Sequence, residues 1–128
     1  GKEHIFYSGM SNMFKNEHFD EVTVEGTRLD TFCKEQSISS IDLLWIDVEG
    51  AELKALKSLG DLLKTVKFLQ VESPIEPSNS DSCDFNSINS YLTSFGFDYL
   101  DKDRIHKNIE DKEGFTDVVF INTTLLNH

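Results

Sequence analysis

Residues 41–53 of the chain read IDLLWIDVEGAEL, and this stretch decides the fold. Its first part, Ile41 to Val48, is a nearly continuous apolar run that only Asp42 and Asp47 interrupt. Such a run is typical of a parallel strand that is buried on both faces of a sheet. From Gly50 onward leucines recur at steps of three and four, which predicts a helix with one apolar side. These leucines are Leu53, Leu56, Leu59 and Leu63.

A second strand and a second helix follow. Val66 to Val71 is rich in β-forming residues, and Pro74 ends the strand because proline lacks a backbone donor. Asp84 caps the next helix, which Gly96 ends. We assign Trp45 and the apolar side of this helix to the core, because packing is the commonest use of such residues. That side consists of Phe85, Ile88, Leu92 and Phe95.

Shorter elements are predicted at the two ends of the chain. His4 to Tyr7 and Val22 to Val24 read as short strands, and Thr27 with Asp30 has the spacing of a capping box for a helix. Near the other end, residues 97–100 and 114–123 read as strands. The charged segment between these strands, residues 101–113, fits the connection of a terminal antiparallel hairpin.

The alternation of strands and helices predicts an α/β fold, a sheet with helices on both faces. The chain has 128 residues, of which 38% are hydrophobic, and this suits one domain, residues 1–128, with one core. The formal net charge of −11 repels nucleic acid and anionic membranes. No apolar run approaches the roughly 20 residues of a membrane span, and the amino terminus shows no secretory signal. Two cysteines fit reduced thiols in a cytoplasmic protein.

Carboxylates follow both predicted central strands. Asp47 and Glu49 come after the first strand and Glu72 after the second. Ligands of open α/β sheets bind beyond the carboxyl ends of the strands, so these side chains line one rim if the strands adjoin. There they could orient a cationic or hydroxylated ligand, act as a general base, or help to hold a divalent ion. Negative charge is also favoured at a helix start without any function; we prefer this explanation for Glu52, and for Glu49 both interpretations stay open.

The sequence lacks the patterns of a zinc site, of a serine hydrolase and of a nucleotide-hydrolysing enzyme. The histidines have no partner at ligand spacing and neither cysteine belongs to a C-x-x-C motif, so we expect no metal site of the zinc type. The chain also lacks a G-x-S-x-G elbow and a Walker loop.

Three stretches together resemble the FkbM family of S-adenosylmethionine-dependent methyltransferases. They are residues 27–32 (TRLDTF), residues 41–53, and residues 66–72 (VKFLQVE), and the resemblance extends to about Phe97. It implies a Rossmann-like enzyme that transfers a methyl group from S-adenosylmethionine to a hydroxyl oxygen of a small-molecule or saccharide acceptor. On this chain, Asp47 is then the first candidate for the base or acceptor-orienting residue, with Glu49 and Glu72 as supporting contacts.

The resemblance covers the carboxyl-terminal half of the family's domain. The family's glycine-rich turn, and the acidic residue that closes its second strand, have no counterpart here; none of the seven glycines lies within two positions of another. The first strands of the sheet and most of the cofactor site are therefore expected to be missing, and Trp45 stands where the family usually has lysine. Without a neighbour, the strand Ile41 to Val48 is an exposed apolar edge, which predicts a homodimer or a swapped assembly.

Two other functions stay open at this point. The chain could be a non-enzymatic remnant or an acidic, dimeric interaction module, which would have no affinity for S-adenosylmethionine. Alternatively, the acidic rim could hold a divalent metal for hydrolysis, in which case the metal would raise the melting temperature.

Overall fold

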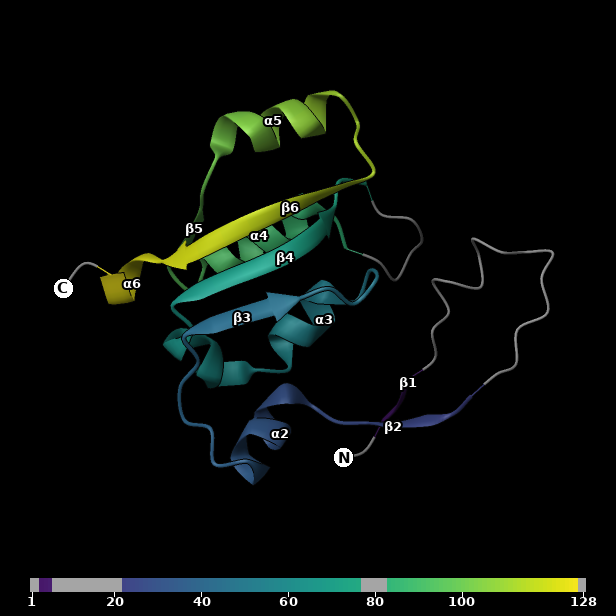
Figure 1. Ribbon diagram of the computed structural model, residues 1–128, viewed down its shortest axis with the longest axis vertical. Helices are drawn as coiled ribbons and strands as arrows, with labels where there is room; N and C mark the ends of the chain where they lie inside the picture. Colours follow the sequence, from purple (N-terminus) through teal and green to yellow (C-terminus); the bar gives the residue numbers. More distant parts are fainter. Residues whose placement is uncertain (1–2, 6–21, 77–82, 127–128) are drawn as a thin grey trace.

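The computed structural model describes residues 3–5, 22–76 and 83–126. These residues form a mixed α/β fold with a four-stranded sheet and a separate two-stranded ribbon (Figure 1). The sheet contains β3 (Leu43–Ile46), β4 (Phe68–Pro74), β5 (Phe97–Tyr99) and β6 (Phe115–Asn122). The ribbon pairs β1 (Glu3–Ile5) antiparallel with β2 (Val24–Gly26). The predicted α/β class is confirmed; Tyr7, the predicted end of the first strand, lies outside the described residues.

Strand order in the sheet is β3-β4-β6-β5. β3 and β4 are parallel, with Ile46 beside Val71, whereas β6 runs antiparallel to both β4 and β5. The predicted adjacency of the two central strands and the antiparallel pairing of the last two are therefore confirmed. Pro74 is the last residue of β4, as expected for a residue without a backbone donor.

The helices are α2, α3, α4, α5, α6 and the 3₁₀ helix η1. Their bounds are Leu29–Glu35, Glu52–Lys57, Phe85–Thr93, Lys102–Glu110, Thr123–Leu126 and, for η1, Gly60–Thr65. The helix predicted from Gly50 onward is therefore two helices, and Gly60, the first residue of η1, has a left-handed φ of 55° that interrupts the run. The spacing of its leucines is nevertheless correct: Leu56, Leu59 and Leu63 are all buried.

The charge of the connection between β5 and β6 predicts a plain loop. The connection contains α5 instead. Ile105 is fully buried and Ile109, four residues later, packs against the same core. Residues four apart lie on one side of a helix, so these two isoleucines anchor α5 while its charged residues face outward.

The core lies on one face of the sheet. Alternate residues of β4 and β6 point to that face, and Leu69, Val71, Val118 and Phe120 are all fully buried there. α4 lies behind the sheet in Figure 1 and contributes three further buried residues. They are Phe85, Ile88 and Leu92.

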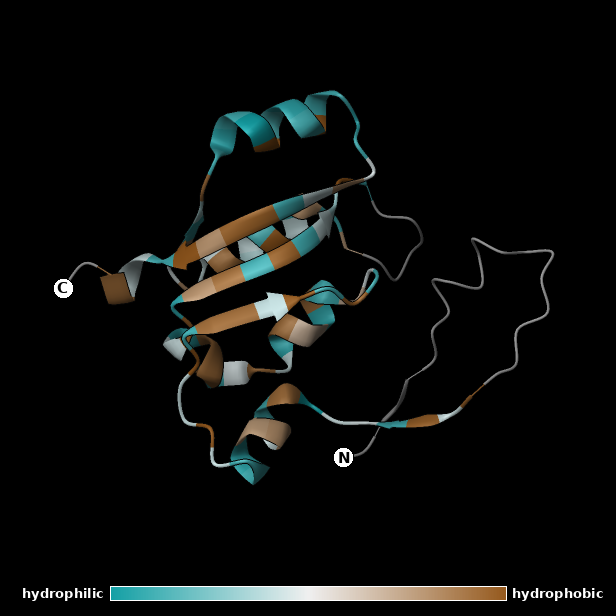
Figure 2. Ribbon diagram, in the orientation of Figure 1, coloured by the Kyte–Doolittle hydropathy of each residue, from teal (hydrophilic) through white to brown (hydrophobic). Residues whose placement is uncertain are grey.

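The opposite face of the sheet is open among the described residues. Leu43 is 62% exposed, Trp45 70% and Phe68 40%, and in the view of Figure 2 no helix lies in front of β3 and β4. The expectation that Ile41 to Val48 is buried on both faces is therefore wrong, as is the assignment of Trp45 to the core. Within the part of the chain that the structure describes, β3 is the last strand of the sheet and has one neighbour, β4.

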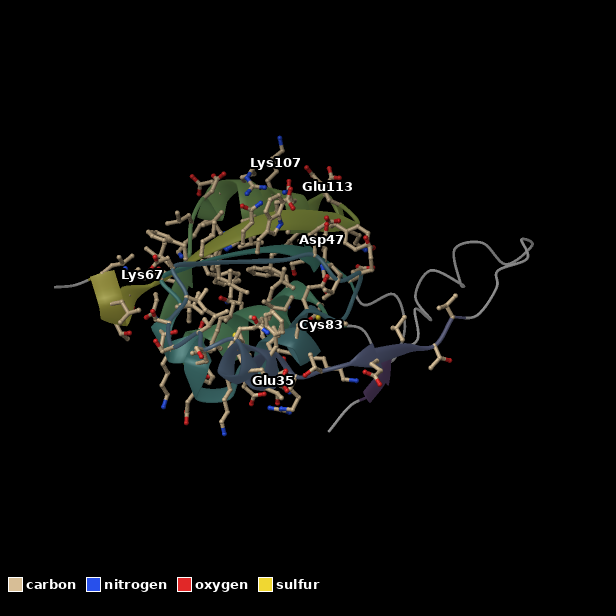
Figure 3. All side chains as sticks on the ribbon, turned by 60° about the horizontal axis from the view of Figure 1, so that its bottom comes forward. Glu35, Asp47, Lys67, Cys83, Lys107 and Glu113 are labelled. Carbon is tan, nitrogen blue, oxygen red and sulfur yellow. The ribbon has the colours of Figure 1, made fainter. Side chains whose placement is uncertain are left out.

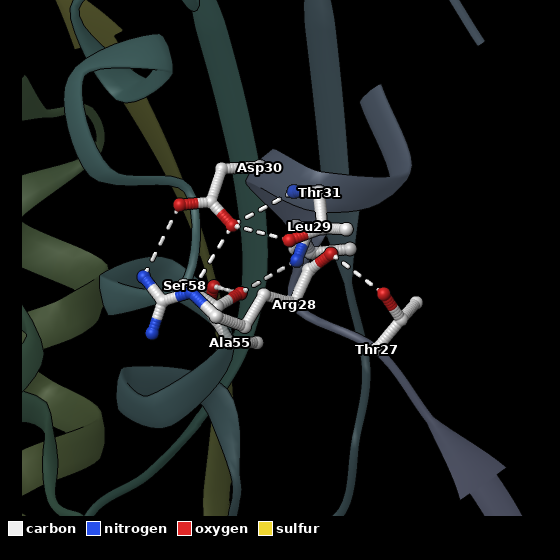
Figure 4. Close-up of polar contacts among 7 residues, drawn as sticks. All are labelled: Thr27, Arg28, Leu29, Asp30, Thr31, Ala55 and Ser58. Carbon is white, nitrogen blue, oxygen red and sulfur yellow. Dashed lines mark hydrogen bonds and ion pairs between the residues drawn. The ribbon is translucent and has the colours of Figure 1, made fainter. Parts of the chain in front are cut away.

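α2 begins without the predicted capping box. Thr27 donates its hydroxyl to the Arg28 carbonyl (3.3 Å), and Asp30 forms an ion pair with Arg28 (3.1 Å) (Figure 4). Free amide hydrogens at the helix start are satisfied by Ser58 instead, which accepts from Leu29 N at its hydroxyl and from Asp30 N at its carbonyl. α2 is thereby tied to the end of α3.

Removing the cap of α4 should cost about 1 kcal/mol of stability. The Asp84 carboxylate accepts from Ser87 N at 2.9 Å and from Ser87 Oγ at 2.8 Å, which confirms the predicted cap. Asp84→Ala loses both bonds, whereas Asp84→Asn keeps an acceptor oxygen and should remain close to the parent protein. Urea denaturation of the two variants measures the difference; equal losses would show that the cap is unimportant.

Candidate active site

A turn with unusual backbone geometry joins β3 to α3. Glu49 has a φ of 51° and Gly50 a φ of 102°, so two consecutive residues lie in the left-handed region. For a residue other than glycine this conformation costs about 1–3 kcal/mol and persists only where neighbouring groups hold it. Glu49 is exposed on this turn, immediately beyond the end of the strand.

The side chain of Glu52 accepts a hydrogen bond from the backbone of this turn. Glu52 is only 1% exposed, and its Oε1 accepts a hydrogen bond from Gly50 N at 3.2 Å. The Cys83 thiol lies 4.0 Å from the other carboxylate oxygen and 3.8 Å from the Gly50 carbonyl oxygen. Burial raises the pKa of Cys83, with the Glu52 charge adding to the effect, so the thiol stays protonated and can donate.

The predicted site residues lie at one end of the sheet. Because β3 and β4 are parallel with Ile46 beside Val71, Asp47, which follows β3, and Glu72, the third residue from the end of β4, occupy equivalent positions toward the carboxyl ends of adjoining strands. Asp117 of β6 lies opposite Glu72 of β4. Asp117 is not among the site residues predicted from the sequence. We call Asp47, Glu49, Glu72 and Asp117 the acidic rim. Figure 3 shows Asp47 at the end of the sheet away from Lys67.

The electrostatics of Glu72 reflect these neighbours. Burial raises the pKa of Glu72, and the negative charges of the other rim residues and of Glu52 raise it further. Among the described residues, no lysine or arginine forms an ion pair with a rim carboxylate. The rim therefore presents a negative potential that attracts cations and repels anions, although Arg104 donates a hydrogen bond to the carbonyl oxygen of Asp117 at 2.7 Å.

The raised pKa of Glu72 leads to a pH-dependent prediction. A carboxyl group whose pKa is higher in the folded state than its ordinary 4.5 destabilises the fold once both states are ionised. Stability is therefore lost as pH rises from this value through the folded pKa. Glu72→Gln should raise the melting temperature at pH 7 and leave it unchanged at pH 3.5.

Thermal unfolding of Glu72→Gln at the two pH values measures this effect. Glu35→Gln, the same change at an exposed position of α2, is the control and should shift neither melting temperature. A gain for Glu72→Gln that is equal at both pH values would mean that its charge is not the cause.

The rim is open to solvent. Two surface hollows of the described chain lie away from the rim: one of about 420 Å³ lies between α2 and η1, and one of about 780 Å³ lies beside Phe95, Gly96 and Thr124. Within residues 3–5, 22–76 and 83–126, no three His, Cys, Asp or Glu side chains are arranged to hold a metal ion. The described helices also include none with the length and apolar character needed to cross a membrane.

Comparisons with known proteins agree with the resemblance. Residues 3–99 match the model of the methyltransferase FkbM domain. The chain is 39% identical over 51 residues to the 2-O-methyltransferase NoeI of Sinorhizobium fredii, a match that covers 40% of this chain and 21% of that protein. No solved structure matches the chain. Because the family model spans most of the sequence, the chain belongs to the FkbM methyltransferase family.

Proposed function

We propose that this protein transfers a methyl group from S-adenosylmethionine to a hydroxyl oxygen of a small-molecule or saccharide acceptor. Membership of the methyltransferase family and the similarity to a 2-O-methyltransferase support the reaction type. The observation that carries the proposal is the acidic rim, because it stands at the carboxyl ends of adjoining parallel strands, where open α/β sheets bind their ligands.

The rim suits the demands of this reaction. S-adenosylmethionine supplies a methyl group on a positively charged sulfur, and the negative potential of the rim favours such a cation. The seven glycines form no G-x-G turn, so this chain offers the acceptor side and the electrostatics rather than a glycine-rich cradle for the cofactor.

Rim residues take separate parts in this proposal. Asp47 is exposed, so its carboxylate can accept the hydrogen bond of an acceptor hydroxyl and take its proton. The raised pKa of Glu72 shifts that carboxylate toward the working pH, which favours a role as a second base. Glu49 lies beside them and fixes the acceptor orientation, since methyl transfer in line requires accurate placement of the oxygen.

The experiment is a calorimetric titration of S-adenosylmethionine into the protein expressed from its natural reading frame, and into the 128-residue chain beside it. A saccharide with a free 2-hydroxyl and its 2-deoxy analogue then serve as acceptors. We expect binding, and transfer to the first saccharide alone. Absence of binding in both proteins would contradict the proposal.

A second candidate function is a non-enzymatic interaction module. Its support is the open apolar face of Leu43, Trp45 and Phe68 among the described residues. This candidate predicts no heat on titration with S-adenosylmethionine. The same titration therefore separates the two functions.

The open edge of β3 supports a homodimer under either function. Two β3 strands that pair antiparallel place each acidic rim beside the opposite end of the partner's sheet, which carries Lys67, rather than beside the other rim. Trp45, the one tryptophan, would then have a strand on each side. We expect a dimeric mass at micromolar concentration that Leu43→Lys abolishes; a monomer would refute the pairing.

A cytoplasmic location also belongs to this proposal. Cys33 and Cys83 are both free and buried. Free thiols are typical of proteins from reducing compartments.

A further inference from the structure

We infer that Glu52 is a positioning residue. Its buried carboxylate holds the left-handed turn that places Glu49 beside the other residues of the acidic rim. This inference rests on the proposed function for its catalytic consequence, but its structural part stands independently. Glu52 is a charged side chain with 1% exposure, and its bond to Gly50 N joins the first residue of α3 to the middle of the turn.

Burial of Glu52 calls for an explanation, because a buried carboxylate costs free energy unless its oxygens are bonded. One oxygen accepts from Gly50 N and the other lies 4.0 Å from the Cys83 thiol. A negative charge at the start of a helix gains from the free amide groups there, yet that gain is available to an exposed side chain as well. The buried position of Glu52 adds a hydrogen bond from Gly50 N to this general gain.

That contact bears directly on Glu49. Glu49 and Gly50 are consecutive left-handed residues, and only glycine adopts this conformation without strain. A bond that fixes the amide of Gly50 also fixes the peptide that follows Glu49, and so the direction of the Glu49 side chain. Loss of the Glu52 oxygen should let the turn relax and move Glu49 away from the rim.

One variant of Glu49, combined with two variants of Glu52, tests this without any activity assay. Glu49→Gly removes the strain, so it should raise the melting temperature of the parent protein by roughly 3–6 °C. In the Glu52→Ala background the turn has already relaxed, and the same change should bring no gain. Glu52→Gln keeps an acceptor oxygen for Gly50 N, so Glu49→Gly should stabilise that variant as it does the parent.

Equal gains from Glu49→Gly in all three backgrounds would overturn the inference, because Glu52 would then have no hold on the turn. Methyl transfer gives a second readout. Glu52→Ala should lower kcat by about 10- to 100-fold, since a small misplacement of a reacting group has that cost, while KM for S-adenosylmethionine and the activity of Glu52→Gln change little.

The two readouts distinguish the inference from the function on which it partly rests. A parent protein that transfers no methyl group would refute the proposed function, whereas the melting temperatures would still decide the role of Glu52. A normal kcat in Glu52→Ala would refute the positioning role even if transfer itself is confirmed.

Discussion

Asn122→Asp is expected to destabilise the protein by about 3–5 kcal/mol at pH 7. Asn122 is fully buried at the end of β6, and its Nδ2 donates to the carbonyl oxygens of Lys64 (3.1 Å) and Val66 (3.0 Å). Its Oδ1 accepts from the backbone amide and the hydroxyl of Thr124, at 3.1 Å and 2.6 Å. Aspartate replaces the donor by a negative oxygen that faces two carbonyl oxygens.

Urea denaturation measures this loss, and pH provides an internal check. Protonated aspartate can donate one hydrogen bond, so the variant should regain stability as pH falls through the raised pKa of the new carboxyl group. Asn86→Asp, the same chemical change on the exposed side of α4, should stay within about 0.5 kcal/mol of the parent. A loss below about 1 kcal/mol for Asn122→Asp would contradict the predicted role of this side chain.

Asp47→Asn is expected to lower kcat for methyl transfer by about 10²- to 10⁴-fold, the usual contribution of a general base. An amide can still lie beside the acceptor hydroxyl but cannot take its proton. KM for the acceptor should therefore change much less than kcat. Steady-state kinetics of the protein expressed from its natural reading frame measure both quantities.

Asp42→Asn is the matched control for this variant. Asp42 precedes β3 as Asp47 follows it, and it forms an exposed ion pair with Lys67 at 3.0 Å. It lies at the end of the sheet away from the rim, so its variant should retain the activity of the parent. Equal losses in the two variants would mean that a general change of charge, not a base at Asp47, is responsible.

The central strands and the rim could be predicted from sequence because both depend on local pattern. Apolar runs identify β3 and β4, and the parallel pairing of the two then brings Asp47 and Glu72 to one end. Asp117 could not be found in this way, since it joins the rim only through the register of β6 against β4. Such a register is set by contacts between distant segments and leaves no local signal.

Other differences between prediction and structure have equally specific causes. Trp45 is exposed although its segment is apolar, because burial depends on what covers the second face of β3 and its free edge. α5 could not be predicted because most of its residues are charged or polar, and only Ile105 and Ile109 pack against the core. The left-handed turn at Glu49 has no sequence signal beyond the glycine that follows it.

Transfer of a labelled methyl group from S-adenosylmethionine to a saccharide hydroxyl, by the parent protein and by Asp47→Asn in parallel, tests the central claim most directly. The acidic rim at the ends of β3 and β4 predicts labelled product from the parent and a loss of at least about 100-fold in the variant. Labelled product at equal rates from both proteins would contradict it.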